Sequence, residues 1–336
     1  MNNVAVKKSR NASAVIFGFD YQIDASICLF VRNIKKVEEI KVEGKYEDIE
    51  QVLNDGSIIY CQVKSVIDPI NTTENTKRSK LKKALESLAE CPINTNDKLL
   101  YCSNQKDILI SDSSLFSNNS ILEYKYQYLD DASKKIINKY FKNRIEKCNS
   151  LSIIKIPYNI SEDEKTRKAF IYETMKDLLI SISEDPSFCY SICDTWHEYL
   201  KNSAYAENPL TKKELVWMLV ITILNTKLDY DDLVDDERIL DDVKGKYGDL
   251  VLNKLLNFET YNKLQFIYET AKQKDDKKKI RINDVFCENS KEILLTIYCK
   301  EEYSDIEMAT ALVIFSSMIK LNSRVKKIKE VCKIEN

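Results

Sequence analysis

A turn signal between two β-prone runs places the strongest constraint on how this chain folds. Residues 46–53 and 57–66 are rich in β-branched and aromatic side chains, and the three residues between them are Asn, Asp and Gly. A three-residue hairpin loop whose last residue is a left-handed glycine suits this sequence. We therefore predict a β-hairpin in which Leu53 lies opposite Ser57.

This register decides which side chains share one face of the two strands. Side chains alternate between faces along a strand, so Asp48 is predicted to lie directly opposite Gln62, with Lys64 on the same face. Cys61 and Val63 then face the other way. A two-residue Asp-Gly turn would instead turn Asp48 to the opposite face, so the predicted site depends on the three-residue turn.

One carboxylate, one amide and one ammonium on a single strand face suit a site for a hard divalent cation. Such cations prefer oxygen ligands, so Asp48, the amide oxygen of Gln62 and the backbone carbonyl of Val63 are predicted to hold Mg²⁺ or Mn²⁺. Lys64 would then orient or deprotonate an attacking water, or offset charge on a phosphate. Glu43, at the end of the preceding strand, is a candidate for a second metal or a water contact.

The elements predicted around the hairpin indicate an α+β fold. A helix is expected to begin at Asp20 as its N-cap, with Gly18 just outside it. The other expected elements are strands over 37–43, 98–102 and 152–156 and helices over 77–90 and 130–147. Their order along the first 105 residues, αβββαβ, is that of an α+β core rather than of a βαβ repeat.

The pattern becomes almost wholly helical beyond residue 161. A chain of 336 residues is also longer than a single hydrophobic core usually supports. We therefore expect an α+β domain over 1–160 and an all-helical domain over 161–336.

Composition excludes several functional classes. The single histidine leaves little room for triads, and the five glycines form neither a P-loop nor a GxGxxG turn. The ten cysteines include no CxxC pair, which favours reduced thiols. Cys189, Cys193 and His197 have helical spacing, but no fourth zinc ligand is evident and we expect a packed helix face. The longest apolar stretch, over 215–224, is about half of a membrane span, so we expect a cytoplasmic protein.

Contact with nucleic acid must come from local patches, because the net charge is only −2. One basic segment follows the predicted site in the sequence and is a candidate DNA-binding surface. Its members are Lys77, Arg78, Lys80, Lys82 and Lys83. The same residues are explained equally well as solvent-exposed side chains at the start of a helix, with no role in DNA binding.

Four short motifs resemble a known nuclease domain. They are Gly18-Phe-Asp-Tyr-Gln22, expected to open the first helix, then Val42-Glu43, Glu47-Asp48-Ile49 and Gln62-Val-Lys64. Together they are similar to the PD-(D/E)xK nuclease domain of bacterial anti-phage effectors, found in CBASS effector endonucleases and in the nuclease subunit of Lamassu systems. The resemblance implies a restriction-endonuclease-like core in which Asp48, Gln62 and Lys64 are catalytic, with Gln22 and Glu43 as supporting groups.

With a nuclease-like domain followed by helices, the chain most resembles the domain order of a Lamassu nuclease subunit. This resemblance implies a Mg²⁺-dependent endonuclease that cuts double-stranded DNA, docks on an SMC-like ATPase and a small companion subunit, and forms homo-oligomers on activation. Two alternatives stay open. One is a CBASS effector gated by a cyclic oligonucleotide, and the other is a non-catalytic DNA-binding or scaffold subunit with the same fold.

Overall fold

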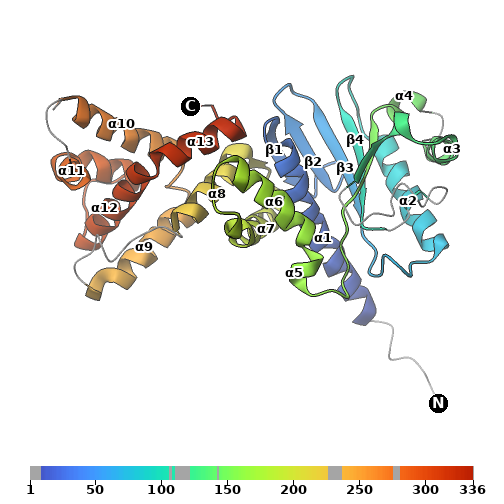
Figure 1. The fold of residues 1–336 in the computed structure, drawn as a ribbon, viewed down its shortest axis with the longest axis horizontal. Coiled ribbons are helices and arrows are strands. Elements are labelled where there is room, and N and C mark those ends of the chain that lie inside the picture. The colour runs from blue at the N-terminus through green and yellow to red at the C-terminus, as the bar shows by residue number, and fades with distance from the viewer. Residues whose placement is uncertain are drawn as a thin grey trace, which may run out of the picture. The chain divides into compact units, whose positions relative to one another are not determined.

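The computed structural model describes residues 9–105, 108–109, 122–141, 144–225, 237–274 and 281–335. The chain forms two compact units, Met1–Lys212 and Lys213–Asn336, called here the first and the second unit. The first unit is a mixed α/β structure built on one seven-stranded sheet (Figure 1). The boundary between the units falls later than the expected division at residue 160, because helices that follow that position pack on the first helix of the sheet unit.

The sheet combines an antiparallel half with a parallel centre. Its strands are β1 (Val37–Val42), β2 (Ile49–Leu53), β3 (Ile58–Lys64), β4 (Lys98–Ser103), β5 (Leu122–Lys125), β6 (Leu151–Lys155) and β7 (Leu210–Thr211). They follow the order β5-β6-β4-β3-β2-β1-β7, in which β4 runs parallel to β3 and β6, and the other neighbours are antiparallel. The short strands β5 and β7 were not predicted, and β7 adds a strand within the region expected to be helical.

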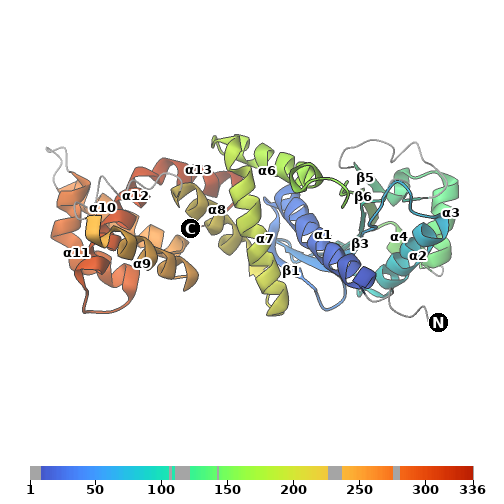
Figure 2. The ribbon, with the colours of Figure 1, turned by 90° about the horizontal axis from the view of Figure 1, so that it is seen from below.

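Helices cover both faces of the sheet, as Figures 1 and 2 show. One face carries α1 (Ser9–Asn33), α6 (Ala169–Ser181) and α7 (Cys189–Tyr205). The other carries α2 (Glu74–Glu90), α3 (Asp131–Tyr140) and α4 (Ile145–Cys148). The remaining helical segments are η1 (Tyr126–Tyr128), α5 (Glu164–Arg167) and η2 (Pro186–Phe188). Because both faces are covered, residues 59–63 of β3 are all buried, the polar Gln62 among them, and burial does not alternate along the strand.

Helix α1 begins at Ser9, so the expectation that it begins at Asp20 is wrong. Residues 9–19 contain two alanines and several large apolar residues that continue the helix. The single interior glycine, Gly18, lowers the stability of the helix by only about 1 kcal/mol relative to alanine. The five-residue motif from Gly18 to Gln22 therefore lies in the middle of the helix. A side chain at Gly18 would meet Ser65 Oγ at 3.5 Å, so this stretch of α1 runs close to the end of β3.

The apolar character of α1 reflects its place in the core. Residues 21–30 are all buried, because the sheet lies on one side of the helix and α6 and α7 lie on the other. The segment Ser13–Asn33 is long and apolar enough to cross a membrane by length and composition, and 67% of its most apolar window is buried in the structure. Such burial is typical of a core helix.

The hairpin between β2 and β3 has the predicted register. Ile49 pairs with Cys61 and Val52 pairs with Ile58. The Leu53 amide donates to the Ser57 carbonyl at 2.8 Å, and the loop glycine, Gly56, has a φ of 79°. The three-residue turn is therefore confirmed, and with it the face on which Asp48 was expected.

Strand β2 starts at Ile49 rather than at residue 46, because the preceding residues form a tight turn. Glu43 has a φ of 54°, and the Gly44 amide donates to the Glu47 carbonyl at 2.9 Å. The Glu50 carboxylate accepts from the Tyr46 amide at 2.6 Å and closes the turn. Asp48 is thus the last residue of this turn, directly before the strand.

The described part of the second unit consists of helices. They are α8 (Lys212–Asn225), η3 (Glu237–Ile239), α9 (Leu240–Leu252), α10 (Phe258–Lys274), α11 (Ile282–Tyr298), α12 (Asp305–Lys320) and α13 (Asn322–Cys332). Helix α12 contacts α9, α10, α11 and α13, and it is the central element of this unit (Figure 2). Val243 and Val313 are buried where α9 meets α12.

Candidate active site

Three donors of strand β3 converge on one carboxylate oxygen of Asp48. The backbone amide of Val63 donates to Asp48 Oδ2 at 2.8 Å, and Lys64 Nζ lies 3.4 Å from the same oxygen. The side-chain amide of Gln62 also donates to it through Nε2. The structure therefore brings together the four residues that the sequence predicted would share this position.

The backbone of Asp48 is held as firmly as its side chain. Its carbonyl accepts from Nε2 of Gln22 at 2.8 Å and from the amide of Glu43 at 2.8 Å. Gln22 is buried on α1, so this hydrogen bond ties the turn before β2 to the first helix. Gln22 was singled out by resemblance alone, and the structure gives it a physical task as a positioning residue for Asp48.

An open hollow of about 530 Å³ lies beside this cluster. Residues from α1, from the end of β3, from the loop after it and from the start of α2 line the hollow. Those that carry polar side chains are Gln22, Asp48, Lys64, Ser65, Asp68, Thr72, Thr73, Thr76 and Lys80. Asp48 and Lys64 are each about one quarter exposed, so solvent and a ligand can reach them.

Glu43 does not share this hollow. Its side chain is exposed, and the residues that line the hollow do not include it. The left-handed backbone of Glu43 ends β1 and turns the chain before the carboxyl group can face Asp48. Glu43 therefore contributes its backbone amide to the cluster, whereas the sequence led us to expect its carboxylate there.

Glu47 precedes Asp48 in the turn, and its side chain is buried against the end of α2. It is 5% exposed, and Cys91 Sγ donates to its Oε1 at 3.4 Å. Burial raises the pKa of this carboxyl group to about 7, and hydrogen bonds from Ser87 and Cys91 offset only part of the increase. Glu47 thus anchors the turn that carries Asp48 against α2.

Four of the five basic residues on α2 lie away from the hollow. Lys77 is buried, and Lys83 is exposed outside the lining. The two others form ion pairs along the helix surface, Arg78 with Glu74 at 3.2 Å and Lys82 with Glu86 at 3.9 Å. Helical spacing distributes the five residues around α2, which is why they do not form one patch. Lys80 alone of the five faces the hollow.

Sequence reasoning missed Asn104, which fixes the end of β3. Its side chain is 1% exposed, accepts from the Val66 amide at 2.8 Å and donates to the carbonyls of Val66 and Tyr158 at 2.7 Å each. Asparagine after a strand is common in turns, so nothing in the sequence marked this residue.

Asp48 offers a carboxylate to a hard divalent cation, and the three groups that contact its Oδ2 in this structure are nitrogen donors. The described residues contain no group of three His, Cys, Asp or Glu placed to hold a metal ion, so an ion here would take its other ligands from Gln62, Val63, water and substrate. The Val63 amide faces Asp48, and the N–H and C=O of one strand residue point to the same side, so the Val63 carbonyl faces that side too. Carboxylate, amide and carbonyl oxygens are the ligands that Mg²⁺ accepts.

The helical series Cys189, Cys193 and His197 forms a packed helix face, as expected. Both cysteines are buried on α7, and His197 Nδ1 lies 2.9 Å from Asp24 Oδ1. The same Asp24 accepts from the hydroxyl of Tyr158 at 2.8 Å. These contacts link α1, α7 and the chain after β6 inside the first unit.

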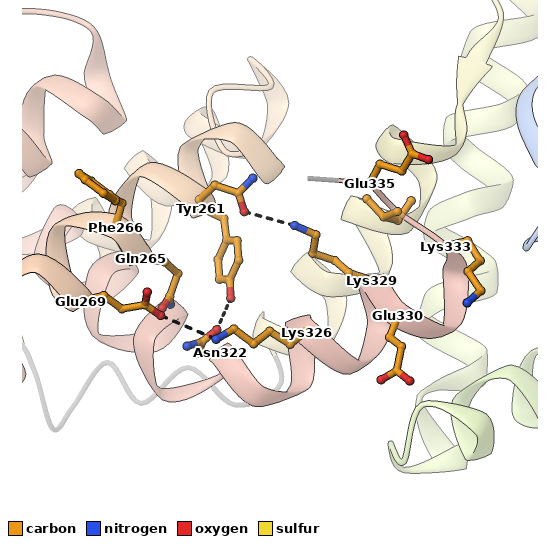
Figure 3. Close-up of a pocket in the computed structure, with 12 residues that line it drawn as sticks. Tyr261, Gln265, Phe266, Glu269, Asn322, Lys326, Lys329, Glu330, Lys333 and Glu335 are labelled. Atoms are coloured by element: carbon orange, nitrogen blue, oxygen red, sulfur yellow. Dashed lines mark hydrogen bonds and ion pairs between the residues drawn. The ribbon is translucent and has the colours of Figure 1, made fainter.

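A larger hollow of about 780 Å³ lies in the second unit, between α10 and α13 (Figure 3). Its charged lining is balanced between three lysines and three glutamates: Lys326, Lys329, Lys333, Glu269, Glu330 and Glu335. Several of its groups are already bonded to one another, as the dashed lines in Figure 3 show for Tyr261 with Asn322 at 2.7 Å and Lys326 with Glu269 at 3.7 Å. None of the residues predicted to carry chemistry lies there.

Comparisons with known proteins yield one weak structural similarity. No protein-family model and no curated protein matches the sequence. Among solved structures, the Cap4 SAVED/CARF-domain containing receptor of Moraxella osloensis is similar to 61% of this chain, with a TM-score of 0.41 and 11% sequence identity. The aligned part covers 47% of that receptor, so the chain spans about half of its length. A similarity at this TM-score carries no argument about function.

Proposed function

We propose that this chain is a metal-dependent DNA endonuclease of the PD-(D/E)xK type. The observation that carries the proposal is the convergence of Gln62, the Val63 amide and Lys64 on Asp48 at the edge of an open hollow. The order of α1, β1, β2, β3, α2 and β4 supports a restriction-endonuclease-like core, as does the parallel pairing of β3 with β4.

Each residue of the cluster has a separate task in this proposal. Asp48, the Gln62 amide oxygen and the Val63 carbonyl would hold Mg²⁺ or Mn²⁺. When bound, the ion would activate a water molecule and neutralise charge on the scissile phosphate. Lys64 would hold the attacking water or offset charge that develops on the phosphate, and Gln22 would keep Asp48 in place.

The biological setting rests on the resemblance of the motifs. We propose an anti-phage defence complex in which the second unit docks on an SMC-like ATPase and a small companion subunit, and in which the nuclease oligomerises on activation. The same resemblance to defence effectors gives the alternative of gating by a cyclic oligonucleotide. Copurification of the full chain with the products of its neighbouring genes tests the choice of partner.

Plasmid cleavage tests the activity. The full chain, at micromolar concentration with 5 to 10 mM Mg²⁺ as rough starting conditions, is expected to nick or linearise supercoiled DNA and to lose this activity in EDTA. Lys64→Ala is expected to reduce the rate by about a hundredfold or more, because it removes a charge that acts in the transition state. Equal cleavage by the wild type and by Lys64→Ala would refute the assignment.

A further inference from the structure

We propose that Lys80 is a second phosphate-contacting residue of the candidate active site and that it binds the DNA backbone next to the scissile phosphate. This inference rests on the proposed nuclease function and adds a residue that lies outside the four motifs. Lys80 comes from helix α2, whereas Asp48, Gln62 and Lys64 come from the hairpin. It lines the same hollow as Asp48 and Lys64.

The position of the Lys80 ammonium is fixed by the strand end. Nζ donates to the carbonyl of Ser65 at 2.6 Å, and Ser65 directly follows Lys64. The two lysines therefore reach the hollow from different elements but are coupled through adjacent backbone. A phosphodiester backbone presents one negative charge per nucleotide, so neighbouring phosphates can be held by two such ammonium groups.

The charges around Lys80 favour an anionic ligand. Within the described part of the chain, no carboxylate lies within ion-pair distance of its Nζ, and its hydrogen bond goes to a neutral carbonyl. Burial lowers the pKa of Lys80, and repulsion from Lys64 and Lys83 lowers it further. A partly buried cation beside two other cations is destabilising by itself, and a bound phosphate would offset this cost.

Among the described residues that line the hollow, the carboxylates are those of Asp48 and Asp68, and neither neutralises Lys80. Asp68 accepts from the amides of Ile70 and Asn71 at 3.0 and 2.8 Å and from the side chain of Asn71 at 2.9 Å. It thereby shapes the loop between β3 and α2. Asp48, for its part, is bonded to Lys64 and to the hairpin backbone.

The two lysines are expected to affect different kinetic constants. Lys64 contacts Asp48, where the chemistry is proposed to occur, so its loss reduces kcat. Lys80 contacts a phosphate that does not react, so its loss weakens binding equally in the ground state and the transition state and raises KM.

The test uses the full chain with Lys80→Gln, Lys80→Arg and a matched control, Lys35→Gln. Lys35 is exposed in the turn after α1, at the opposite end of β1 and β2 from Asp48, and its substitution removes the same charge. Binding of a DNA duplex is measured by fluorescence anisotropy in Ca²⁺ as a function of salt, and cleavage kinetics are measured in Mg²⁺. Thermal unfolding of each variant verifies the fold.

Lys80→Gln is expected to raise Kd and KM about tenfold, to leave kcat within about twofold, and to reduce the salt slope by about one unit. Lys80→Arg is expected to restore binding. Identical behaviour of Lys80→Gln and Lys35→Gln would overturn the inference, as would a fall in kcat at constant KM. If the wild type neither binds nor cleaves DNA, the proposed function itself fails and takes the inference with it.

Discussion

Replacement of Glu47 by glutamine should stabilise the first unit at neutral and alkaline pH. Glu47 is 5% exposed, and its pKa is raised to about 7 by burial, from an ordinary value of 4.5. Below pH 4 the carboxyl group is protonated in both the folded and the unfolded state, so it carries no penalty, meaning no loss of folding stability from a buried charge. Between pH 4.5 and 7 the unfolded chain releases the proton while the folded chain keeps it, so stability falls as pH rises. Above pH 7 the penalty is complete.

The size of this penalty follows from the pKa difference. Each unit corresponds to about 1.4 kcal/mol, so the shift sets an upper value of roughly 3 kcal/mol, of which about 2 kcal/mol develops between pH 5.5 and 8. Glutamine keeps the shape of the side chain and never carries the charge. Glu47→Gln and the wild type should therefore differ by about 2 kcal/mol more at pH 8 than at pH 5.5.

Urea unfolding measures this difference in unfolding free energy, provided that one fluorescent residue reports on the first unit alone. The chain has two tryptophans, Trp196 in the first unit and Trp217 in the second, so a Trp217→Phe background leaves Trp196 as the single tryptophan reporter. All buffers contain EDTA. Glu162→Gln is the matched control, because Glu162 is exposed in the same unit. A constant difference between Glu47→Gln and the wild type at both pH values, or a larger one at pH 5.5, would show that burial does not raise the pKa of Glu47.

Three further substitutions test the hairpin turn, helix α9 and the proposed metal site. Gly56→Ala should destabilise the first unit by about 1 kcal/mol, because Gly56 has a φ of 79°. Gly245→Ala in α9 should instead stabilise the second unit by up to about 1 kcal/mol, since the space around Gly245 is open and helical alanine is favoured. Opposite signs in thermal unfolding are expected, and equal signs would contradict the assigned turn. Gln62→Glu should lower the Mg²⁺ concentration for half-maximal cleavage several-fold, since it adds a carboxylate beside Asp48. An unchanged Mg²⁺ requirement would remove Gln62 from the metal site.

The register of the hairpin could be predicted because it depends on local chemistry. A loop of three residues ending in glycine has few allowed conformations, and the alternation of strand side chains then places Asp48, Gln62 and Lys64 together. The order of the first elements was also predictable from their patterns. These parts need no knowledge of distant contacts.

The start of α1 and the contacts of Gln22 could not be predicted from local sequence patterns. A buried helix loses the amphipathic pattern that marks its ends, so Asp20 resembled an N-cap although it lies inside α1. The hydrogen bond from Gln22 to the Asp48 carbonyl joins residues that are far apart in the sequence, and no local rule predicts it. Likewise, Glu43 was expected at the site because the sequence indicated that it ends a strand. The sequence did not indicate that its backbone is left-handed.

The position of a bound metal ion is the strictest test of the proposed active site. Crystals of the full chain grown with Mn²⁺ and a duplex carrying a non-hydrolysable backbone, with diffraction collected at the manganese edge, should show an anomalous peak about 2.2 Å from the Asp48 carboxylate and near the Gln62 side chain and the Val63 carbonyl. A manganese peak elsewhere on the chain, or none at Asp48 while DNA occupies the hollow, would exclude Asp48 as the metal ligand.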